Sequence, residues 1–209
     1  MKPGARIGLD FDNTIVIYDQ VFAKLGQEEG LLPAGFVGSK DEARAFIRAL
    51  PDGEAKWTKL QAAVYGPGIR AASMAPGLKA FLRSALAHRC ELTIVSHKTE
   101  FAAADPQGTN LRDAARGWIV ANQLAGTVDA PILLENIYFE STRAEKIGRI
   151  AALRCDCFID DLEEVFEESD FPRRTERHLI KVGAVTLPAG PFKAWQSWQD
   201  IEQEFFGAR

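Results

Sequence analysis

The feature that most constrains the fold is a set of five short apolar segments separated by stretches with helical periodicity. Each segment is rich in Ile, Val or Phe and alternates little with polar residues, which is typical of strands buried on both faces of a parallel sheet. We therefore predict an α/β fold with a doubly wound, parallel five-stranded sheet. The predicted strands are residues 6–9, 91–95, 136–139, 155–159 and 178–182.

Helical signals lie between these segments. Pro76 and Gly77 open a predicted helix that ends near residue 88, with proline at a first-turn position. Thr109 is the predicted N-cap of a helix that ends near residue 124. Thr142 and Glu145 have the spacing of a capping box, which predicts a helix from there to about residue 153.

One long stretch interrupts the alternation of strands and helices. Residues 16–75 contain no convincing strand. Ser39 and Glu42 form another capping-box pattern ahead of residues 43–50, and residues 54–65 have the pattern of a further helix. We predict a core domain made of residues 1–15 and 76–209, and a small helical cap domain at residues 16–75.

Composition narrows the class of protein. The net charge of −4 argues against nonspecific nucleic-acid binding, which requires clustered positive charge. The three cysteines, Cys90, Cys155 and Cys157, have irregular spacings, so we expect reduced thiols and a cytoplasmic protein. No apolar run approaches a membrane span, and the first eight residues lack the apolar stretch of a secretory signal.

Polar residues with catalytic potential follow four of the predicted strands. In an open α/β sheet, ligands bind beyond the carboxyl ends of the strands, so these residues should converge on one edge. They are Asp10 and Asp12 after the first strand, Ser96 and His97 after the second, Lys146 in the helix that follows the third, and Asp160 and Asp161 after the fourth.

The acidic residues suit phosphoryl transfer with a metal ion. A carboxylate at Asp10 can attack phosphorus and form an aspartyl-phosphate. Asp12 can protonate the leaving oxygen and later deprotonate water. Mg²⁺ prefers carboxylate oxygens, water and phosphate as ligands, and Asp10 and Asp160 can supply such oxygens, with Asp161 direct or through water.

Ser96 and Lys146 are candidates for holding phosphoryl oxygens, where negative charge must be stabilised. Each has an ordinary alternative, because an isolated serine is more often a cap and an isolated helix lysine is usually solvated. An aspartate after a strand is likewise common as a turn or cap residue. The order and placement of the whole set favour the functional interpretation.

The same residues resemble the motifs of the haloacid dehalogenase-like (HAD) superfamily. Residues 10–14, Asp-Phe-Asp-Asn-Thr, match its first motif, D-x-D-x-T, and residues 93–96 resemble its second, a strand that ends in Ser or Thr. Lys146 matches the third motif, and residues 158–161 resemble the fourth, an apolar strand that ends in paired acids. The interval of 14 residues between Lys146 and Asp160 is short for many members.

The resemblance implies a phosphatase whose nucleophile is Asp10 and whose general acid and base is Asp12. It implies Mg²⁺ held by Asp10, the Asp12 backbone carbonyl and Asp160, and a helical cap that selects the substrate. At His97, many relatives carry Asn, and two interpretations stay open, a phosphate contact and a loop cap. A phosphomutase and a non-catalytic ligand-sensing protein are the alternative functions.

The expected partner is a small phosphorylated metabolite such as a sugar phosphate, a polyol phosphate or a nucleotide, bound by a monomer or homodimer. Candidate substrate contacts in the cap share a basic or aromatic side chain, although packing or solvation is the ordinary role of each. They are Lys56, Trp57, Lys59, Tyr65 and Arg70. Aromatic residues near the C-terminus, from Phe192 to Phe206, should pack a final helix onto the core, and a dimer contact is the alternative.

Overall fold

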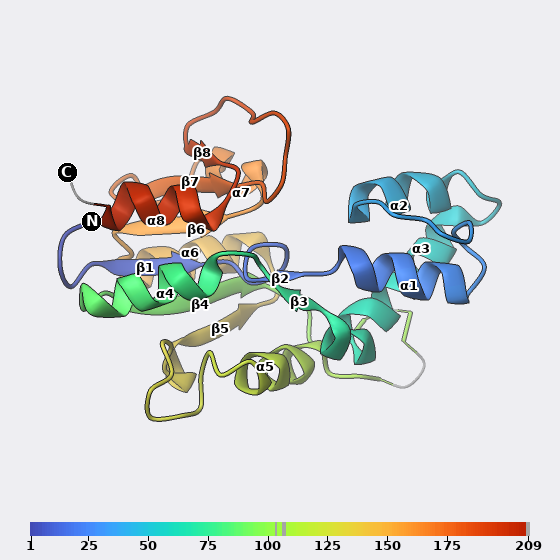
Figure 1. The fold of residues 1–209 in the computed structure, drawn as a ribbon, viewed down its shortest axis with the longest axis horizontal. Helices are drawn as coiled ribbons and strands as arrows, with labels where there is room; N and C mark the ends of the chain where they lie inside the picture. The colour runs from blue at the N-terminus through green and yellow to red at the C-terminus, as the bar shows by residue number, and fades with distance from the viewer. Residues whose placement is uncertain (103, 106–107, 208–209) are drawn as a thin grey trace. The chain divides into compact units, whose positions relative to one another are not determined.

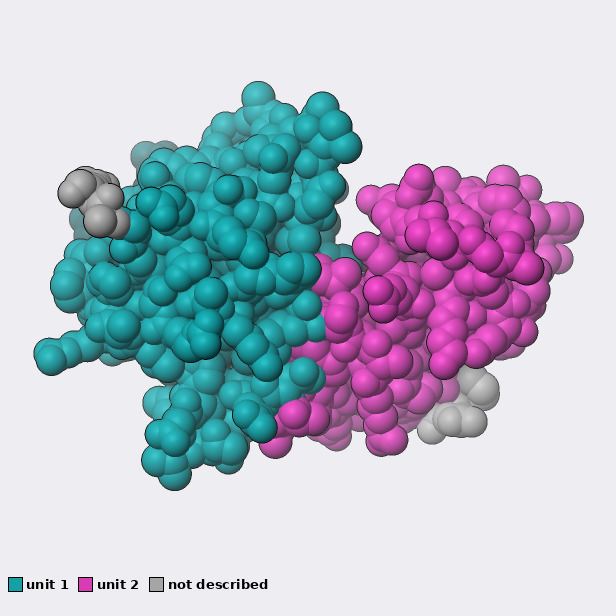
Figure 2. Space-filling model, viewed as in Figure 1, with its two compact units in different colours: residues 1–16, 74–98, 122–209 teal, residues 17–73, 99–121 magenta. Residues whose placement is uncertain are grey.

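The computed structural model describes residues 1–102, 104–105 and 108–207, so the predicted end of the core domain at residue 209 lies outside the described residues. The chain forms two compact units (Figure 2). Unit 1 contains residues 1–16, 74–98 and the described part of 122–209, and unit 2 contains residues 17–73 and the described part of 99–121.

Unit 1 is built on a six-stranded sheet in the order β5-β4-β1-β6-β7-β8 (Figure 1). Every neighbouring pair is parallel. Leu9 of β1 lies opposite Ile94 of β4 and Ile159 of β6, so β1 and β6 end within one residue of each other, while β4 continues to His97. The strands are β1 (Arg6–Leu9), β4 (Glu91–His97), β5 (Ile137–Glu140), β6 (Cys157–Asp160), β7 (Glu176–Ile180) and β8 (Lys193–Trp195).

The predicted α/β class with a parallel sheet is confirmed, and each of the five predicted strands is present within a few residues. The predicted strand number is wrong, because β8 adds a sixth strand beside β7. This strand has only three residues, Lys-Ala-Trp, too few to show an apolar run. Two shorter strands, β2 (Val16–Ile17) and β3 (Ser73–Met74), pair with each other where the chain passes between the units.

Helices cover both faces of the sheet. Helix α4 (Leu78–Ala87) packs against α8 (Trp198–Phe206) on one face, where Phe81 contacts Trp198 and Phe205. On the other face, α6 (Arg143–Leu153) and α7 (Glu163–Glu167) bury their apolar residues against the sheet; this cluster includes Val95, Ile147, Ile150, Phe158, Phe166 and Leu179. The predicted final helix is thus α8, although Trp195 lies in β8 and Phe192 precedes it.

Most of the predicted helix starts are confirmed. The capping boxes at Ser39 and Thr142 both form, at the starts of α2 (Lys40–Arg48) and α6. The cap predicted at Thr109 is wrong: α5 (Leu111–Ala121) begins two residues later. Its first free amides, those of residues 112 and 113, instead donate to Asn110 Oδ1 at 3.0 Å each.

Unit 2 is helical, and most of it is the insertion after β1 and β2 that was predicted as a cap. It contains α1 (Asp19–Glu28), α2, α3 (Gly53–Tyr65), the short 3-10 helix η1 (Pro67–Ala71) and α5. Trp57 is buried among these helices and stacks on Phe22, with ring centroids 4.9 Å apart. A second 3-10 helix, η2 (Leu134–Asn136), precedes β5 in unit 1.

The predicted domain boundaries differ from this division by one or two residues at the two ends of the insertion and, more substantially, at residues 99–121. Residues 99–121 were assigned to the core domain, whereas their described part clusters with the helices of the insertion. Trp118 of α5 is buried there and donates its indole N–H to the Ala72 carbonyl at 3.1 Å. Across the described residues, no helix combines the length and apolar character needed to cross a bilayer.

Candidate active site

Asp10 lies where the central strand ends. β1 stops at Leu9, and the Asp10 amide continues the ladder by donating to the Ile159 carbonyl of β6 at 2.9 Å. The chain then leaves the sheet, and the Asp10 carboxylate lies at the carboxyl end of β1, where its side chain is only 6% exposed. Burial of an aspartate is costly unless the charge is compensated, so its neighbours decide what it can do.

A tight loop follows Asp10 and carries Asp12. The Ile15 and Val16 amides both donate to the Phe11 carbonyl, at 2.9 and 3.1 Å, and the Asn13 amide donates to the Val16 carbonyl at 2.8 Å. Asn13 has a φ of 57°, in the left-handed region that asparagine tolerates better than most residues. These backbone bonds fix the position of Asp12 relative to Asp10.

Lys146 joins the two buried aspartates. Its Nζ donates to Asp10 Oδ1 at 2.6 Å and to Asp160 Oδ2 at 2.7 Å. All three side chains are at least nine-tenths buried. Lys146 lies in the first turns of α6, whose start is fixed by the Thr142 capping box, and the Asp160 Oδ1 accepts the Leu162 amide at 3.0 Å.

The positive charge of Lys146 does not balance the two carboxylates that it contacts. Burial raises the pKa of Asp10 to about 7, and the Asp160 and Asp12 carboxylates act in the same direction, while the Lys146 ammonium opposes the shift. The two carboxylates raise the pKa of Lys146 despite its burial, so the ammonium stays charged. One ammonium faces two buried carboxylates, and a further cation beside them would favour the ionised form of Asp10.

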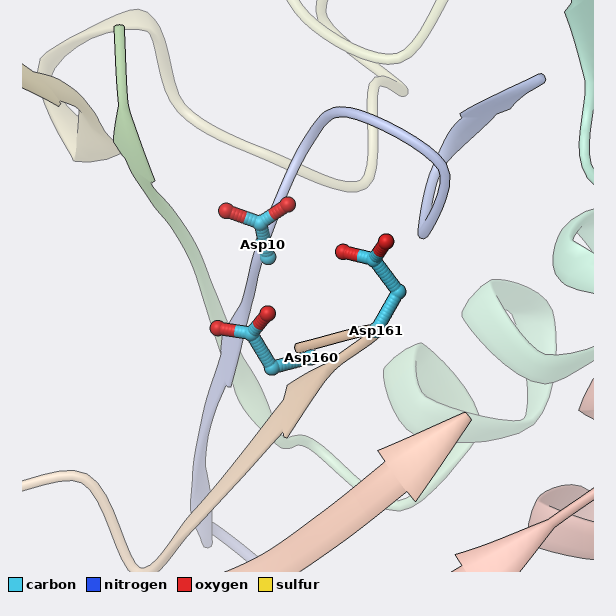
Figure 3. Close-up of side chains that lie close together, drawn as sticks. All are labelled: Asp10, Asp160 and Asp161. Carbon is cyan, nitrogen blue, oxygen red and sulfur yellow. The ribbon is translucent and has the colours of Figure 1, made fainter. Parts of the chain in front are cut away.

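The donor set fits a hard divalent cation. Asp10, Asp160 and Asp161 each offer a carboxylate oxygen, and these oxygens lie within 4.8 Å of one another. Figure 3 shows the three side chains close together where β1 and β6 end. Mg²⁺ binds through one or two carboxylates together with water and phosphate, so this cluster suits it. Asp161 is partly exposed, which leaves one side of the cluster accessible to solvent.

The two residues predicted after the second strand have different environments. Ser96 is buried in β4, next to the central strand. His97 is exposed, and its Nε2 lies 2.9 Å from the Ser141 carbonyl in the loop before α6. That contact corresponds to the loop-cap interpretation of His97, and the phosphate-binding roles of Ser96, His97 and Lys146 stay predictions.

Lys98 follows Ser96 and His97 after the second predicted strand, and no role was predicted for it from the sequence, yet it contacts a predicted catalytic residue. Lys98 is 5% exposed, and its Nζ donates to both carboxylate oxygens of Asp12, at 2.7 and 3.0 Å. A lysine just after a strand is ordinarily solvated, and residues 92–96 are buried on both faces of β4, so the local pattern gave no signal for its burial. In the structure Ser96 and Lys98 are both buried, while His97 between them is exposed.

The predicted cap contacts belong to unit 2. Trp57 and Tyr65 pack with other aromatic rings, as the packing alternative expected. Lys56 donates to the Pro51 carbonyl at 2.7 Å, and Lys59 pairs with Glu29 at 3.2 Å. Arg70 is exposed, and a substrate contact by any of these five residues stays a prediction.

Comparison with known proteins adds evidence on the fold alone. No protein-family model and no curated protein matches the sequence. Solved structures do match over nearly the full length of both chains. A HAD family hydrolase from Deinococcus radiodurans R1, with bound phosphate and sodium, superposes with a TM-score of 0.58 at 15% identity and covers 98% of this chain and 96% of its own.

Two further matches cover essentially whole chains. A proposed phosphoglycolate phosphatase from Lactobacillus delbrueckii subsp. bulgaricus has a TM-score of 0.55 at 13% identity and covers 100% of both chains. The proposed HAD hydrolase YfnB from Bacillus subtilis, bound to magnesium, has a TM-score of 0.55 at 11% identity and covers 99% of this chain and 100% of its own. The resemblance predicted from the four motifs is therefore confirmed at the level of the fold.

Proposed function

We propose that this chain, which has the fold of the HAD-superfamily hydrolases, is a Mg²⁺-dependent phosphatase that transfers the phosphoryl group of a small phosphomonoester to Asp10. The observation that carries this proposal is the contact of one lysine, Lys146, with both Asp10 and Asp160 at the carboxyl ends of β1 and β6. A buried carboxylate beside a cationic group and further metal-ligand oxygens is the arrangement that in-line attack on phosphorus requires.

The first chemical step consumes the ester. A carboxylate oxygen of Asp10 attacks phosphorus, the bond between phosphorus and the ester oxygen breaks, and that oxygen takes a proton from Asp12 as the alcohol leaves. The ammonium of Lys146 would stabilise the charge that develops on the phosphoryl oxygens, and its contact with Asp10 at 2.6 Å supports this role.

The second step regenerates the enzyme. Asp12 accepts a proton from a water molecule, the water oxygen attacks phosphorus, and the acyl-phosphate bond breaks to release inorganic phosphate and the Asp10 carboxylate. Mg²⁺, when bound by Asp10, Asp160 and Asp161, would supply charge neutralisation between the carboxylates and the phosphate. Ser96 would donate a hydrogen bond to a phosphoryl oxygen from the end of β4.

The matched structures support this choice of chemistry without fixing the substrate. One of them holds phosphate, one holds magnesium, and one is a proposed phosphatase of a small carboxylic-acid phosphate. A small phosphorylated metabolite is therefore the proposed substrate class, with Mg²⁺ as the cofactor and the helices of unit 2 as the part that selects among metabolites.

Asp10→Asn tests the proposal directly. Purified protein with Mg²⁺ should release phosphate from p-nitrophenyl phosphate and from members of a phosphorylated-metabolite panel, and chelation should stop the release until Mg²⁺ is restored. Asp10→Asn should lower kcat by more than about 10³-fold, because the nucleophile is lost. Brief acid quenching of the wild type with labelled substrate should trap label on Asp10.

The matched control is Asp170→Asn, at an exposed aspartate beyond α7, which should keep full activity. Circular dichroism should show that both variants are folded. Full turnover by Asp10→Asn would exclude its role as nucleophile. Isomerisation of a sugar phosphate without free phosphate would instead indicate a phosphomutase, and binding without turnover would indicate a sensing protein.

A further inference from the structure

Lys98 occupies an unusual position for a lysine. It follows directly after β4, its side chain is 4% exposed, and its Nζ contacts both carboxylate oxygens of Asp12, whose side chain is 23% exposed. Removing an ammonium from water is unfavourable by several kcal/mol unless a counter-charge is close. Asp12 supplies a counter-charge to the buried ammonium, and both of its carboxylate oxygens accept a bond from Lys98 Nζ.

The base of the Lys98 side chain is also fixed. Its backbone amide donates to the Glu140 carbonyl of β5 at 2.9 Å, so the chain leaves β4 in register with its neighbour. Its Nζ lies 5.7 Å from the centroid of the Phe11 ring, within the range of a cation–π contact. Phe11 is itself buried and packs edge-on against Phe139 of β5.

The two buried lysines contact different carboxylates of the site. Lys146 contacts Asp10 and Asp160, the proposed nucleophile and metal ligand, whereas Lys98 contacts Asp12, the proposed proton donor. A carboxylate with rotational freedom can present its oxygens in many directions. Two hydrogen bonds from a fixed donor restrict Asp12 to one orientation, and proton transfer is sensitive to such geometry.

We propose that Lys98 is a positioning residue that holds the Asp12 carboxyl group in the orientation from which it gives a proton to the leaving oxygen in the first step and, as the carboxylate, takes one from water in the second. This inference rests on the proposed phosphatase activity. It assigns Lys98 no contact with substrate, and it predicts that the benefit of Lys98 is obtained only through Asp12. A purely structural role would instead affect all substrates equally.

The test uses two esters of similar size that differ in their need for a proton. p-Nitrophenolate leaves readily as an anion, whereas phenolate is much more basic and depends on protonation as the bond breaks. The quantity compared is kcat/KM, because it includes the steps up to departure of the alcohol and excludes later hydrolysis of the phosphoenzyme. Both esters are assayed with the full chain and Mg²⁺.

Lys98→Met should lower kcat/KM for phenyl phosphate at least about tenfold more than for p-nitrophenyl phosphate, within the 10²–10⁴-fold range of general acid catalysis. In an Asp12→Asn background, Lys98→Met should change kcat/KM for phenyl phosphate by less than about twofold, because coupled residues are not additive. Lys98→Arg, which keeps the charge and can donate two bonds, should recover part of the selective loss.

The matched control is Lys193→Met, which removes an exposed lysine that pairs with Glu204 at 3.2 Å; it should change neither rate. If Lys98→Met does not fold by circular dichroism, Lys98→Gln and Lys98→Arg carry the same comparison. Equal losses on the two esters, or a further large loss in the Asp12→Asn background, would overturn the positioning role. Failure of the wild type to hydrolyse either ester would contradict the proposed function itself.

Discussion

Two buried lysines, Lys146 and Lys98, show how single residues shape the site. Each is held by carboxylates from other parts of the chain, over sequence separations of 136 residues for Lys146 with Asp10 and 86 for Lys98 with Asp12. Each ammonium replaces its hydration shell with charged oxygens, which compensates the cost of burial. Removal of either lysine would leave a carboxylate without its closest counter-charge.

Gly8 of β1 makes the packing beneath this site possible. A Cβ at this position would lie 2.4 Å from Phe158 Cδ2 and 3.1 Å from Cys155 Sγ. The Phe158 ring is buried in the hydrophobic cluster that α6 and α7 form against the sheet, and Lys146 Nζ lies 5.5 Å from the centroid of this ring. The absence of a side chain at Gly8 therefore lets the ring fill the space beside Lys146.

We predict that Gly8→Ala lowers the free energy of unfolding by about 1–3 kcal/mol, the usual cost of overpacking a core. Urea denaturation measures the change. The matched control is Gly148→Ala. Gly148 lies in helix α6, and a Cβ added there would have no neighbouring atom within 4 Å. This substitution should stabilise the protein by about 0.4–1 kcal/mol. A Gly8→Ala protein as stable as the wild type would show that the ring can move aside without strain.

The convergence of Asp10, Lys146 and Asp160 could be predicted from the sequence, and the contact of Lys98 with Asp12 could not. Asp10, Lys146 and Asp160 each stand at a strand end or helix start that local patterns reveal, and parallel strands bring such ends together. Lys98 also follows a strand, but a lysine there is ordinarily solvated. Its partner, Asp12, lies in a loop whose path depends on the backbone bonds around Asn13, and no local pattern specifies that path.

Helix α6 positions Lys146 beside Asp10 and Asp160. Thr142 Oγ1 accepts the Glu145 amide at 3.1 Å, and Glu145 Oε2 accepts the amides of Ser141 and Thr142 at 3.0 and 2.9 Å. The Ser141 carbonyl in turn contacts the His97 ring. The box therefore fixes both the first turn of the helix and the loop that joins it to β5.

We predict that Thr142→Ala destabilises the protein by about 1 kcal/mol, the typical value for loss of an N-cap hydroxyl. Thr142→Ser keeps the hydroxyl and should stay within about 0.5 kcal/mol of the wild type. Urea denaturation followed by circular dichroism compares the two variants under the same conditions. Equal destabilisation by both would indicate that the threonine methyl group, and not the hydroxyl, is what matters.

Elements with strong local signals were predicted well, and short ones were not. The capping boxes of α2 and α6 involve residues three apart, so the sequence contains the whole interaction. Strand β8 has three residues and exists because Ala194 and its neighbours pair with β7, which is a long-range event. The start of α5 was misplaced because Thr109 and Asn110 are both acceptable caps.

At the scale of the whole molecule, the chain builds its second unit from two separate segments. Residues 16–75 were expected to form a cap by themselves, but α5 joins residues 17–73 from beyond β4 through contacts such as that of Trp118 with Ala72. An amphipathic pattern predicts that one face of a helix will be buried, but it does not identify the element against which that face packs. Assignment of such a helix to a unit therefore requires the tertiary contacts.

The stability of unit 1 should also depend on a buried histidine outside the candidate site. His178 of β7 is fully buried, stacks on Trp195 of β8 and meets the Phe205 ring of α8 edge-on. Trp195 Nε1 donates to its Nδ1 at 3.1 Å, so the neutral ring has its proton on Nε2. Burial lowers the pKa of His178 from 6.5 to about 4, against the opposing influence of Glu176.

This shift predicts how acid destabilises the protein. Between pH 6.5 and about 4, the unfolded chain binds a proton at His178 that the folded chain does not. The contribution of His178 to the free energy of unfolding is therefore fully present above pH 6.5 and is lost as the pH decreases through this range. The expected contribution is on the order of 3 kcal/mol. Urea denaturation at several pH values, followed by tryptophan fluorescence, measures it.

His178→Asn separates this contribution from the acid sensitivity of the carboxylates. The asparagine amide oxygen can accept the Trp195 N–H in place of Nδ1, but the side chain does not titrate. The variant should be less stable than the wild type at pH 7, because it leaves a cavity, and should lose less stability between pH 6.5 and 4. Parallel pH profiles of the two proteins would mean that the His178 ring takes up its proton in the folded state as readily as in the unfolded chain, and that its contacts with Trp195 and Phe205 do not oppose the charge.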